Sequence, residues 1–170
     1  MRVQFSWQSL CMECCNAAMA EEFGVDLPKL PKTFSADDEN GVQRIFEVER
    51  RVLGTAILLT ARERWEHGYE FAVDGELVAD QLTLFDQLKE KTKRGLSKTY
   101  LENGEFPSGE PYITVKGDHL KGVLSYSETN SEEPLVIIDG KPYTWKEVGR
   151  LLQAFEGFQV KIEMKDLADE

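Results

Sequence analysis

Three cysteines near the N-terminus, Cys11, Cys14 and Cys15, are the residues whose types and spacing most suggest chemistry. Two thiolates separated by two residues can bind one metal ion, because the turn between them brings both sulfur atoms together. A tetrahedral zinc site needs four ligands, and no cysteine or histidine precedes Cys11 in the sequence. Cys11 and Cys14 are therefore the predicted metal ligands, an incomplete set that His67, His119 or a second subunit could complete.

The Cys11-x-x-Cys14 pair also admits a redox and a structural interpretation. At the start of a helix, the dipole lowers the pKa of a thiol and favours the reactive thiolate. Redox motifs usually follow a strand and have Pro or Gly between the cysteines, whereas Met12 and Glu13 stand here, and the charge of Glu13 disfavours a thiolate. In the structural interpretation, Cys14 and Cys15 pack a helix onto a sheet as small apolar side chains.

No residues are predicted to be catalytic. His67 and His119 lie outside the metal-binding and nucleophile motifs of known hydrolases, and we expect both in exposed turns. Paired acids could bind Mg²⁺ or cleave glycosides, but 31 acidic residues in 170 make such pairs expected by chance. The sequence favours a protein that is not an enzyme. It leaves open an enzyme that uses the Cys11 and Cys14 thiols or an acidic cleft.

The charge and composition narrow the class of partner and the location. A formal net charge of −11 argues against nucleic acid and against anionic membrane surfaces as partners. Hydrophobic residues make up 41% of the chain, enough for a core, and no apolar run approaches the roughly 20 residues of a membrane-spanning helix. Three cysteines within five residues form no disulfide framework, so we expect a reducing, cytoplasmic location.

The first half predicts a helix, a group of strands and a longer helix. Alanine, methionine and glutamate favour a helix over residues 9–23, with Ser9 as its cap. An Asn-Gly pair at residues 40–41 predicts a hairpin. The expected strands are residues 33–35, 42–48, 55–61 and 69–73, with a turn at residues 74–75 after the last of them.

A long helix is predicted to begin after Asp80, whose carboxylate can cap it. Its apolar stripe, at spacings of three and four, consists of Leu82, Phe85, Leu88, Thr92, Leu96 and Tyr100. We expect Gly95 to break this helix early, and residues 103–109 to form a loop between the two halves.

The second half predicts short strands and a capped helix. Strands are expected at residues 112–115, 120–126 and 135–138, with a surface loop over residues 127–133. Thr144-x-x-Glu147 is a capping box, in which two side chains bond each other's backbone N–H groups. Residues 148–155 supply the inner face of that helix, and Gly157 ends it. The apolar residues Phe158, Val160, Ile162 and Met164 alternate with polar ones, which predicts a final strand.

These elements predict an α+β fold with an N-terminal helix, antiparallel β-rich halves each followed by a helix, and a final C-terminal strand. Residues 1–31 would hold the cysteine-containing helix and a linker, residues 32–103 a β-meander and the long helix, and residues 110–165 the remaining elements. We expect the three parts to form one compact unit. At least one strand edge should stay exposed, which is compatible with a homodimer.

Three segments resemble an uncharacterised bacterial family of unknown function. Residues 10–20 (LCMECCNAAMA) resemble its Cys-x-x-Cys-Tyr-Asn knuckle, residues 68–85 its middle and residues 138–159 its C-terminal signature. The resemblance implies a self-contained α+β fold and no known activity. In that family an upstream Cys-x-x-Cys pair completes a zinc ribbon. Here residues 2–9 hold no cysteine, and Cys15 stands where tyrosine is usual, so the resemblance implies a remnant of the ribbon.

Together these features favour a non-enzymatic protein-binding or regulatory domain whose partner is another protein. It would act through its sheet face or its acidic surface. The alternatives are an enzyme, as above, and an acidic protein that mimics nucleic acid and inhibits DNA-binding proteins. No cofactor is expected, and zinc at Cys11 and Cys14 is the one candidate.

Overall fold

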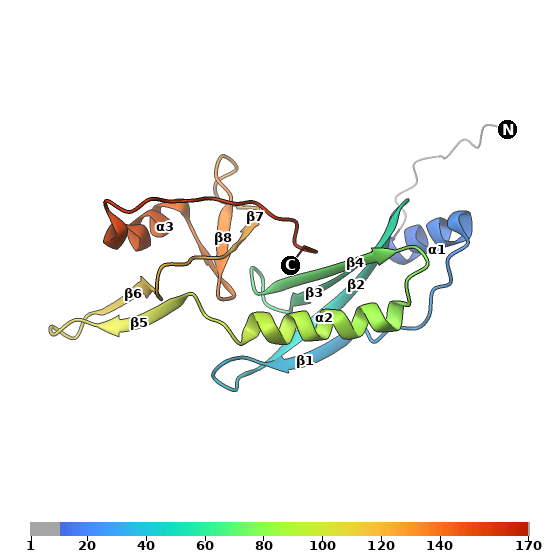
Figure 1. Cartoon of the computed structure of the whole chain (residues 1–170), viewed down its shortest axis with the longest axis horizontal. Helices are drawn as coiled ribbons and strands as arrows, with labels where there is room; N and C mark the ends of the chain where they lie inside the picture. The colour runs from blue at the N-terminus through green and yellow to red at the C-terminus, as the bar shows by residue number, and fades with distance from the viewer. Residues whose placement is uncertain (1–10, 170) are drawn as a thin grey trace.

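The β-rich stretches of the first half fold into a single antiparallel sheet in the computed structural model, which describes residues 11–169. This half contains α1 (Met12–Phe23), β1 (Thr33–Asp37), β2 (Gln43–Val52), β3 (Ala56–Glu63), β4 (Glu70–Glu76) and α2 (Gln81–Leu96). The strands pair in the order β1-β2-β3-β4, and α2 lies along the sheet (Figure 1). The predicted hairpin and meander are confirmed.

The core of this half lies between α2 and the sheet. Leu88 and Leu96 of α2 have no exposed surface, and neither has Phe46 of β2. Phe34 stacks on Phe46 with ring centroids 5.4 Å apart and meets Phe85 edge-on at 5.9 Å. Other buried members of this core are Ala36, Ile57, Leu59, Ala61, Val73 and Leu84. The apolar stripe predicted for the helix therefore faces the sheet, with two exceptions. Leu82 is exposed, and Tyr100 lies beyond the end of α2 and packs against Val136, Ile138 and Val148.

Both ends of α2 agree with the expectations. Asp80 caps the helix as predicted, accepting hydrogen bonds from the Leu82 N–H at 3.1 Å and the Thr83 hydroxyl at 2.7 Å. The early end expected at Gly95 is met to within one residue, because α2 ends at Leu96. A Cβ atom at Gly95 would lie 2.2 Å from Cε1 of Phe71. Glycine at this position lets the helix approach the ring of Phe71.

The turn expected at residues 74–75 is wrong. β4 continues through both residues, with Asp74 opposite Leu58 and Gly75 opposite Ile57. A Cβ atom at Gly75 would lie 2.9 Å from Cδ1 of Leu84. The glycine therefore serves the packing of α2 against the sheet, and the chain turns only after Glu76.

The N-terminal helix α1 packs on β2 through a buried amide. The Asn16 side chain donates to the Arg50 carbonyl at 2.6 Å and accepts from the Val52 N–H at 2.8 Å. Cys11 occupies the N-cap position. Ser9, the expected cap, lies outside the described residues.

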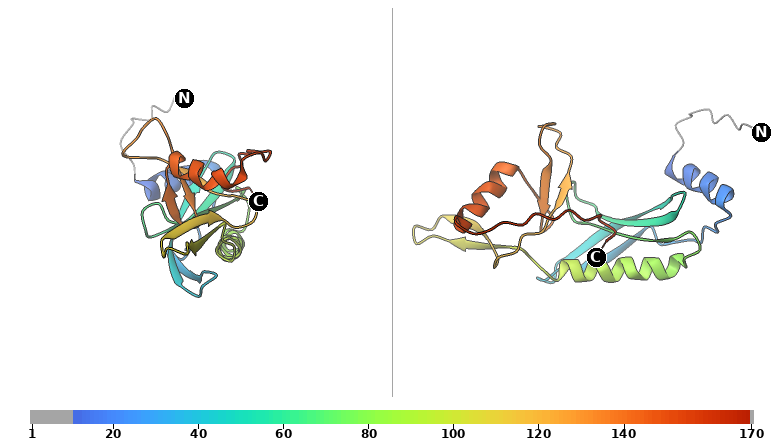
Figure 2. Two further views of the ribbon diagram at one scale, coloured as in Figure 1. Left: turned by 90° about the vertical axis from the view of Figure 1, so that its left-hand side faces the viewer. Right: turned by 45° about the horizontal axis from the view of Figure 1, so that its top comes forward.

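The second half contains two small antiparallel sheets and one short helix. Its elements are β5 (Leu101–Glu105), β6 (Pro111–Val115), β7 (Val123–Ser125), β8 (Leu135–Ile138), β9 (Lys141–Tyr143), α3 (Trp145–Leu152) and the 3₁₀ turn η1 (Gln153–Phe155). β5 pairs with β6, and β7, β8 and β9 form the other sheet (Figure 2). A smaller core joins Val136 and Ile138 of β8 to Val148 of α3. The Thr144–Glu147 capping box is confirmed.

Two expectations for the strands that follow α2 are corrected. The loop expected at residues 103–109 is wrong at its start, because Asn103 and Gly104 belong to β5 and Asn103 pairs with Ile113. An aromatic pair across this hairpin, Phe106 and Tyr112, with centroids 4.6 Å apart, holds the strands in register. The strand expected over residues 120–126 is limited to Val123–Ser125.

The final strand expected at Phe158, Val160, Ile162 and Met164 is wrong. These residues form an extended stretch of chain outside any strand (Figure 1), and they pair with none of the strands in the described part of the chain. The apolar and polar residues still alternate along this exposed segment, which is described below.

The predicted α+β class is confirmed, with an N-terminal helix and antiparallel sheets. The division into residues 1–31, 32–103 and 110–165 stays a prediction. Among the described residues, no helix is long and apolar enough to cross a membrane.

Candidate functional site

The predicted metal ligands Cys11 and Cys14 lie together at the start of α1. Cys11 has an extended backbone, and its Sγ accepts the Cys14 N–H at 3.2 Å. The two sulfur atoms are 2.8 Å apart in a thiol–thiol hydrogen bond, and both residues are exposed. The hydrogen bonds from the side chain and then the backbone of Cys14 lower the pKa of the Cys11 thiol. The same hydrogen bond, together with the charge of Cys11, raises the pKa of Cys14.

Cys11 and Cys14 would supply two of the four ligands that a zinc site needs. Among residues 11–169, no three His, Cys, Asp or Glu side chains come close enough together to hold a metal ion. Two thiolates on one tetrahedral zinc would be about 3.8 Å apart, given Zn–S bonds of about 2.3 Å, against 2.8 Å here. His119 bonds its neighbour Asp118 instead. Metal binding at Cys11 and Cys14 stays a prediction.

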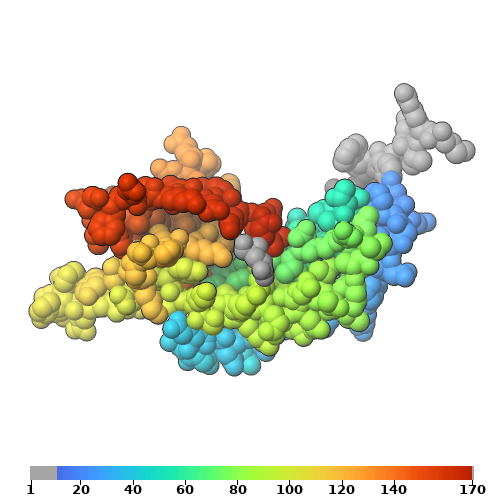
Figure 3. All heavy atoms as spheres, in the orientation of Figure 1, coloured from blue at the N-terminus to red at the C-terminus, as the bar shows by residue number. Residues whose placement is uncertain are grey.

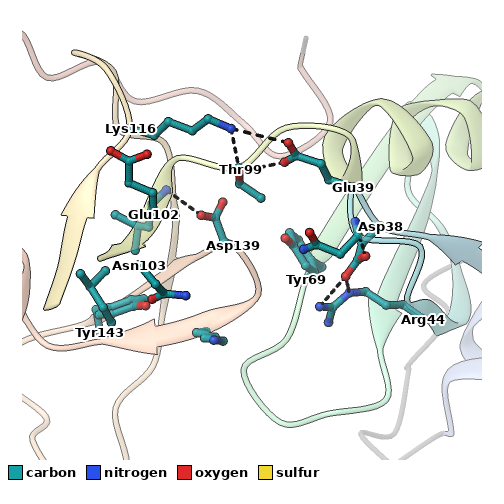
Figure 4. Close-up of a pocket in the computed structure, with 14 residues that line it drawn as sticks. Asp38, Glu39, Arg44, Tyr69, Thr99, Glu102, Asn103, Lys116, Asp139 and Tyr143 are labelled. Carbon is teal, nitrogen blue, oxygen red and sulfur yellow. Dashed lines mark hydrogen bonds and ion pairs between the residues drawn. The ribbon is translucent and has the colours of Figure 1, made fainter. Parts of the chain in front are cut away.

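A polar cleft of about 330 Å³ lies where the first half meets the second (Figure 4). On its first wall, Asp38 accepts the N–H groups of Asn40 and Val42 at 2.9 and 3.0 Å and the Arg44 guanidinium at 3.0 Å. Burial acts to raise the pKa of Asp38, but the Val42 N–H, the Arg44 side chain and the Asn40 N–H outweigh it and lower that pKa.

Arg44 connects this turn to the centre of the sheet. Its guanidinium also bonds Glu63 at 2.7 Å and lies 5.2 Å from the centroid of the Tyr69 ring. Burial, followed by the charge of Asp139, raises the pKa of Tyr69 to about 12. The Tyr69 ring packs against Gly140, where a Cβ atom would lie 2.6 Å from it.

The opposite wall of the cleft is held by Asp139. This residue has a left-handed backbone (φ 50°), and its carboxylate accepts the N–H groups of Tyr100 and Leu101, each at 2.9 Å. Across the cleft mouth, the Thr99 hydroxyl donates to Glu39 at 2.8 Å. The carboxylates of Asp38, Glu39 and Asp139 are thus engaged with backbone N–H groups, the Thr99 hydroxyl or cations, and Glu102 also lines the cleft. The arrangement connects the two halves of the chain.

A second hollow of about 380 Å³ contains His67, which the sequence analysis placed in an exposed turn. His67 has a left-handed backbone (φ 58°), and its Nδ1 lies 3.3 Å from the Ser125 hydroxyl of β7. Glu66 lies 3.9 Å from Nε2, too far for a hydrogen bond, and its side chain is exposed. The pair therefore lacks the oriented third residue of a nucleophilic triad. No local sequence signal could have linked His67 to Ser125.

Four strongly exposed apolar side chains lie on residues 158–165, here called the C-terminal segment. Phe158, Val160, Ile162 and Met164 are 70%, 78%, 71% and 70% exposed. The polar side chains between them form their own row, in which Glu163 lies 3.3 Å from Lys161. Single exposed apolar residues are ordinary on protein surfaces, but a row of four on one extended segment indicates a binding surface.

Both ends of the C-terminal segment are attached to the body of the protein. At its start, the Phe158 N–H donates to the Phe155 carbonyl at 2.9 Å, and the two rings meet edge-on at 5.5 Å. Beyond its end, the Lys91 ammonium on α2 donates to the carbonyls of Leu167, Ala168 and Asp169 at 3.0, 2.9 and 2.8 Å. Figure 3 shows this stretch, in red, running across the surface from α3 towards the first half.

Two family models match the chain. Residues 28–97 match a domain of unknown function (DUF7686), and residues 100–169 match a second domain of unknown function (DUF7713). The two matched ranges meet between α2 and β5. They agree with a family of unknown function and name no activity. No curated protein and no solved structure matches the chain.

Proposed function

We propose that this protein is a non-enzymatic protein-binding domain that adds its C-terminal segment as a strand to the sheet edge of a partner protein. The observation that carries the proposal is the row of four apolar side chains, each at least 70% exposed, on a chain that is already extended. Alternation of apolar and polar residues is what a strand needs when one face packs on a core and the other meets water.

The backbone of the segment supports this mode of binding. Residues 159–164 make no backbone hydrogen bond within the described part of the chain. A partner's edge strand would supply those bonds, and its core would cover the apolar row, as in other cases of strand addition. Fully burying one such side chain contributes about 1.5–3 kcal/mol. Because both ends are attached, part of the ordering cost is met before binding.

Charge indicates the kind of partner. The chain carries a net charge of −11, so a partner with a basic rim around the docking edge would be attracted and correctly oriented. The polar side of the segment carries Lys161, Glu163 and Lys165 and does not repel either sign strongly. The partner is therefore expected to have an exposed edge strand with apolar side chains, flanked by basic residues.

The test compares two double variants of the full chain that differ only in which face they alter. Val160→Gln with Ile162→Gln removes the centre of the apolar row, and Lys161→Gln with Glu163→Gln alters the polar row without changing net charge. Each chain is immobilised and used to capture proteins from an extract of the source cells. The partner captured by the wild type is then purified, and its affinity for each chain is measured by calorimetry.

We expect the Val160/Ile162 variant to lose at least tenfold in affinity and the Lys161/Glu163 variant to stay near the wild type. A photo-crosslinking residue at position 159 should attach to a strand of the partner. Equal affinity of both variants, or crosslinks outside any strand, would contradict the proposal. Dimerisation of the purified wild type that the Val160/Ile162 variant loses would also contradict it, since the occupant would then be a second copy of this chain.

A further inference from the structure

Cys11 and Cys14 form a pair of exposed, touching thiols whose chemistry is separate from the proposed binding function. Their sulfur atoms are 2.8 Å apart and both residues are exposed, so no other side chain has to move to bring them into contact. We propose that Cys11 and Cys14 form a reversible disulfide, with Cys11 as the attacking thiol, Cys14 as the resolving thiol and a low-molecular-weight disulfide such as oxidised glutathione as the oxidant.

The geometry favours a disulfide over a metal. A disulfide has an S–S bond of about 2.05 Å and needs two cysteines alone, whereas zinc needs two further ligands that residues 11–169 do not place here. The extended N-cap conformation of Cys11 turns its side chain back over the first turn of α1, where Cys14 lies. Closing the bond leaves the body of the helix unchanged.

The surroundings distinguish the two sulfur atoms. Cys11 Sγ lies at the N-cap of α1 and accepts the Cys14 N–H at 3.2 Å, and a backbone donor at the start of a helix stabilises a thiolate. Glu13, whose charge opposes that thiolate, bonds Lys32 at 3.2 Å, and the cation partly offsets it. In the described part of the chain no backbone N–H donates to the Cys14 sulfur, so the thiolate forms first on Cys11. Cys11 is therefore the nucleophile, and Cys14 reacts second.

The exchange balances in two steps. The Cys11 thiolate attacks one sulfur of oxidised glutathione, and a mixed disulfide forms as one glutathione thiolate leaves. Cys14 then loses its proton to water and attacks the Cys11 sulfur, and the second glutathione thiolate leaves. The protein loses two electrons and two protons in total, and one glutathione disulfide becomes two glutathione molecules.

The test uses the full-length reduced chain in buffers of graded reduced and oxidised glutathione. Free thiols are trapped by alkylation, and the products are identified by mass spectrometry of peptides. The wild type is expected to lose two hydrogens and to yield a Cys11–Cys14 crosslink, reversed by excess reduced glutathione. Cys14→Ser should accumulate glutathione on Cys11, whereas Cys11→Ser should carry severalfold less on Cys14. Cys15→Ser is the matched control and should behave as the wild type.

Serine is a good N-cap residue and both positions are exposed, so the variants are expected to fold, which circular dichroism checks. The proposal is overturned if both thiols stay reduced in excess oxidised glutathione, if Cys15 enters the crosslink, or if glutathione accumulates preferentially on Cys14. It is also overturned if the purified chain holds zinc that shields both thiols from alkylation. Loss of partner binding in the Val160/Ile162 variant bears only on the proposed function, so the two tests fail separately.

Discussion

At the scale of single residues, the carboxylates in the cleft between the halves act as structural connectors. Asp139 holds the backbone of Tyr100 and Leu101, and Asp38 holds its own turn and Arg44. A buried carboxylate that accepts several N–H bonds stabilises the fold in its charged form. The contacts of Asp38 and Asp139 are therefore explained by folding.

Replacement of Asp38 by asparagine tests this role through its pH dependence. The pKa of Asp38 in the folded chain lies below its ordinary value of 3.8, so its contribution to stability is full above about pH 4 and is lost as the pH falls through the lowered pKa. Asp38→Asn should cost about 1–3 kcal/mol near neutral pH. That difference from the wild type should shrink as the pH falls below 3.8.

Urea unfolding of the wild type and the variant, at several pH values, measures this difference. Glu128→Gln, which changes an exposed carboxylate, is the control and should leave stability within about 0.5 kcal/mol of the wild type. A cost for Asp38→Asn that stays constant down to low pH would show that the charge of Asp38 is not what stabilises the turn.

The residue scale also shows how much of the candidate site could be predicted. The contact between Cys11 and Cys14 followed from their spacing, because it is local. The contacts of Asp139 with Tyr100 and of His67 with Ser125 span 39 and 58 residues. They depend on how two halves pack, and nothing in the local sequence records that packing.

At the scale of elements, most helices and strands were predictable, and the role of two glycines was not. The pattern of α2 and the Asn-Gly hairpin are periodic or local signals, and both were correct. The wrong expectation at Gly75 treated glycine as a turn, whereas β4 continues through it. Gly75 and Gly95 each leave room for a side chain from another element, Leu84 and Phe71 respectively. Sequence shows that a Cβ is missing, but not what fills the space.

Two glycine-to-alanine changes separate these roles. Alanine favours helix over glycine by about 1 kcal/mol, and Gly149 of α3 has nothing within 4 Å of an added Cβ. Gly149→Ala should therefore stabilise the protein by about 0.5–1 kcal/mol. Gly95→Ala should destabilise it by about 1–3 kcal/mol, because the added methyl group would overlap the Phe71 ring.

Chemical denaturation of both variants measures whether each substitution raises or lowers the free energy of unfolding. If Gly95→Ala stabilised the protein as much as Gly149→Ala, the close approach of α2 to Phe71 would not contribute to stability. A double variant, Gly95→Ala with Phe71→Leu, should recover part of the loss, since leucine leaves space for the new methyl group.

At the scale of the whole molecule, the C-terminal segment shows that alternating apolar and polar residues are not enough to predict a strand. Its alternation is as regular as that of β4, yet only β4 has a neighbouring strand to pair with. Alternation describes which side chains share a face, whereas a strand also requires a hydrogen-bonding edge. The same pattern that failed to predict secondary structure thus identifies the surface with which this protein is proposed to bind another.

The attachment of this segment to α2 joins the C-terminal part of the chain to the first half, and Lys91 is the residue to change. Lys91→Met keeps the long apolar stem but removes the ammonium that holds three carbonyl groups beyond the segment. With one end released, the segment should sample more conformations, and trypsin should cleave after Lys161 and Lys165 severalfold faster. Lys93→Met, on the same helix and paired only locally with Glu90, should be cleaved at the wild-type rate. Because the core does not involve Lys91, the unfolding temperature should change little. Equal cleavage of the two variants would mean that the segment is held by its Phe155 contact alone and that Lys91 does not preorganise it for a partner.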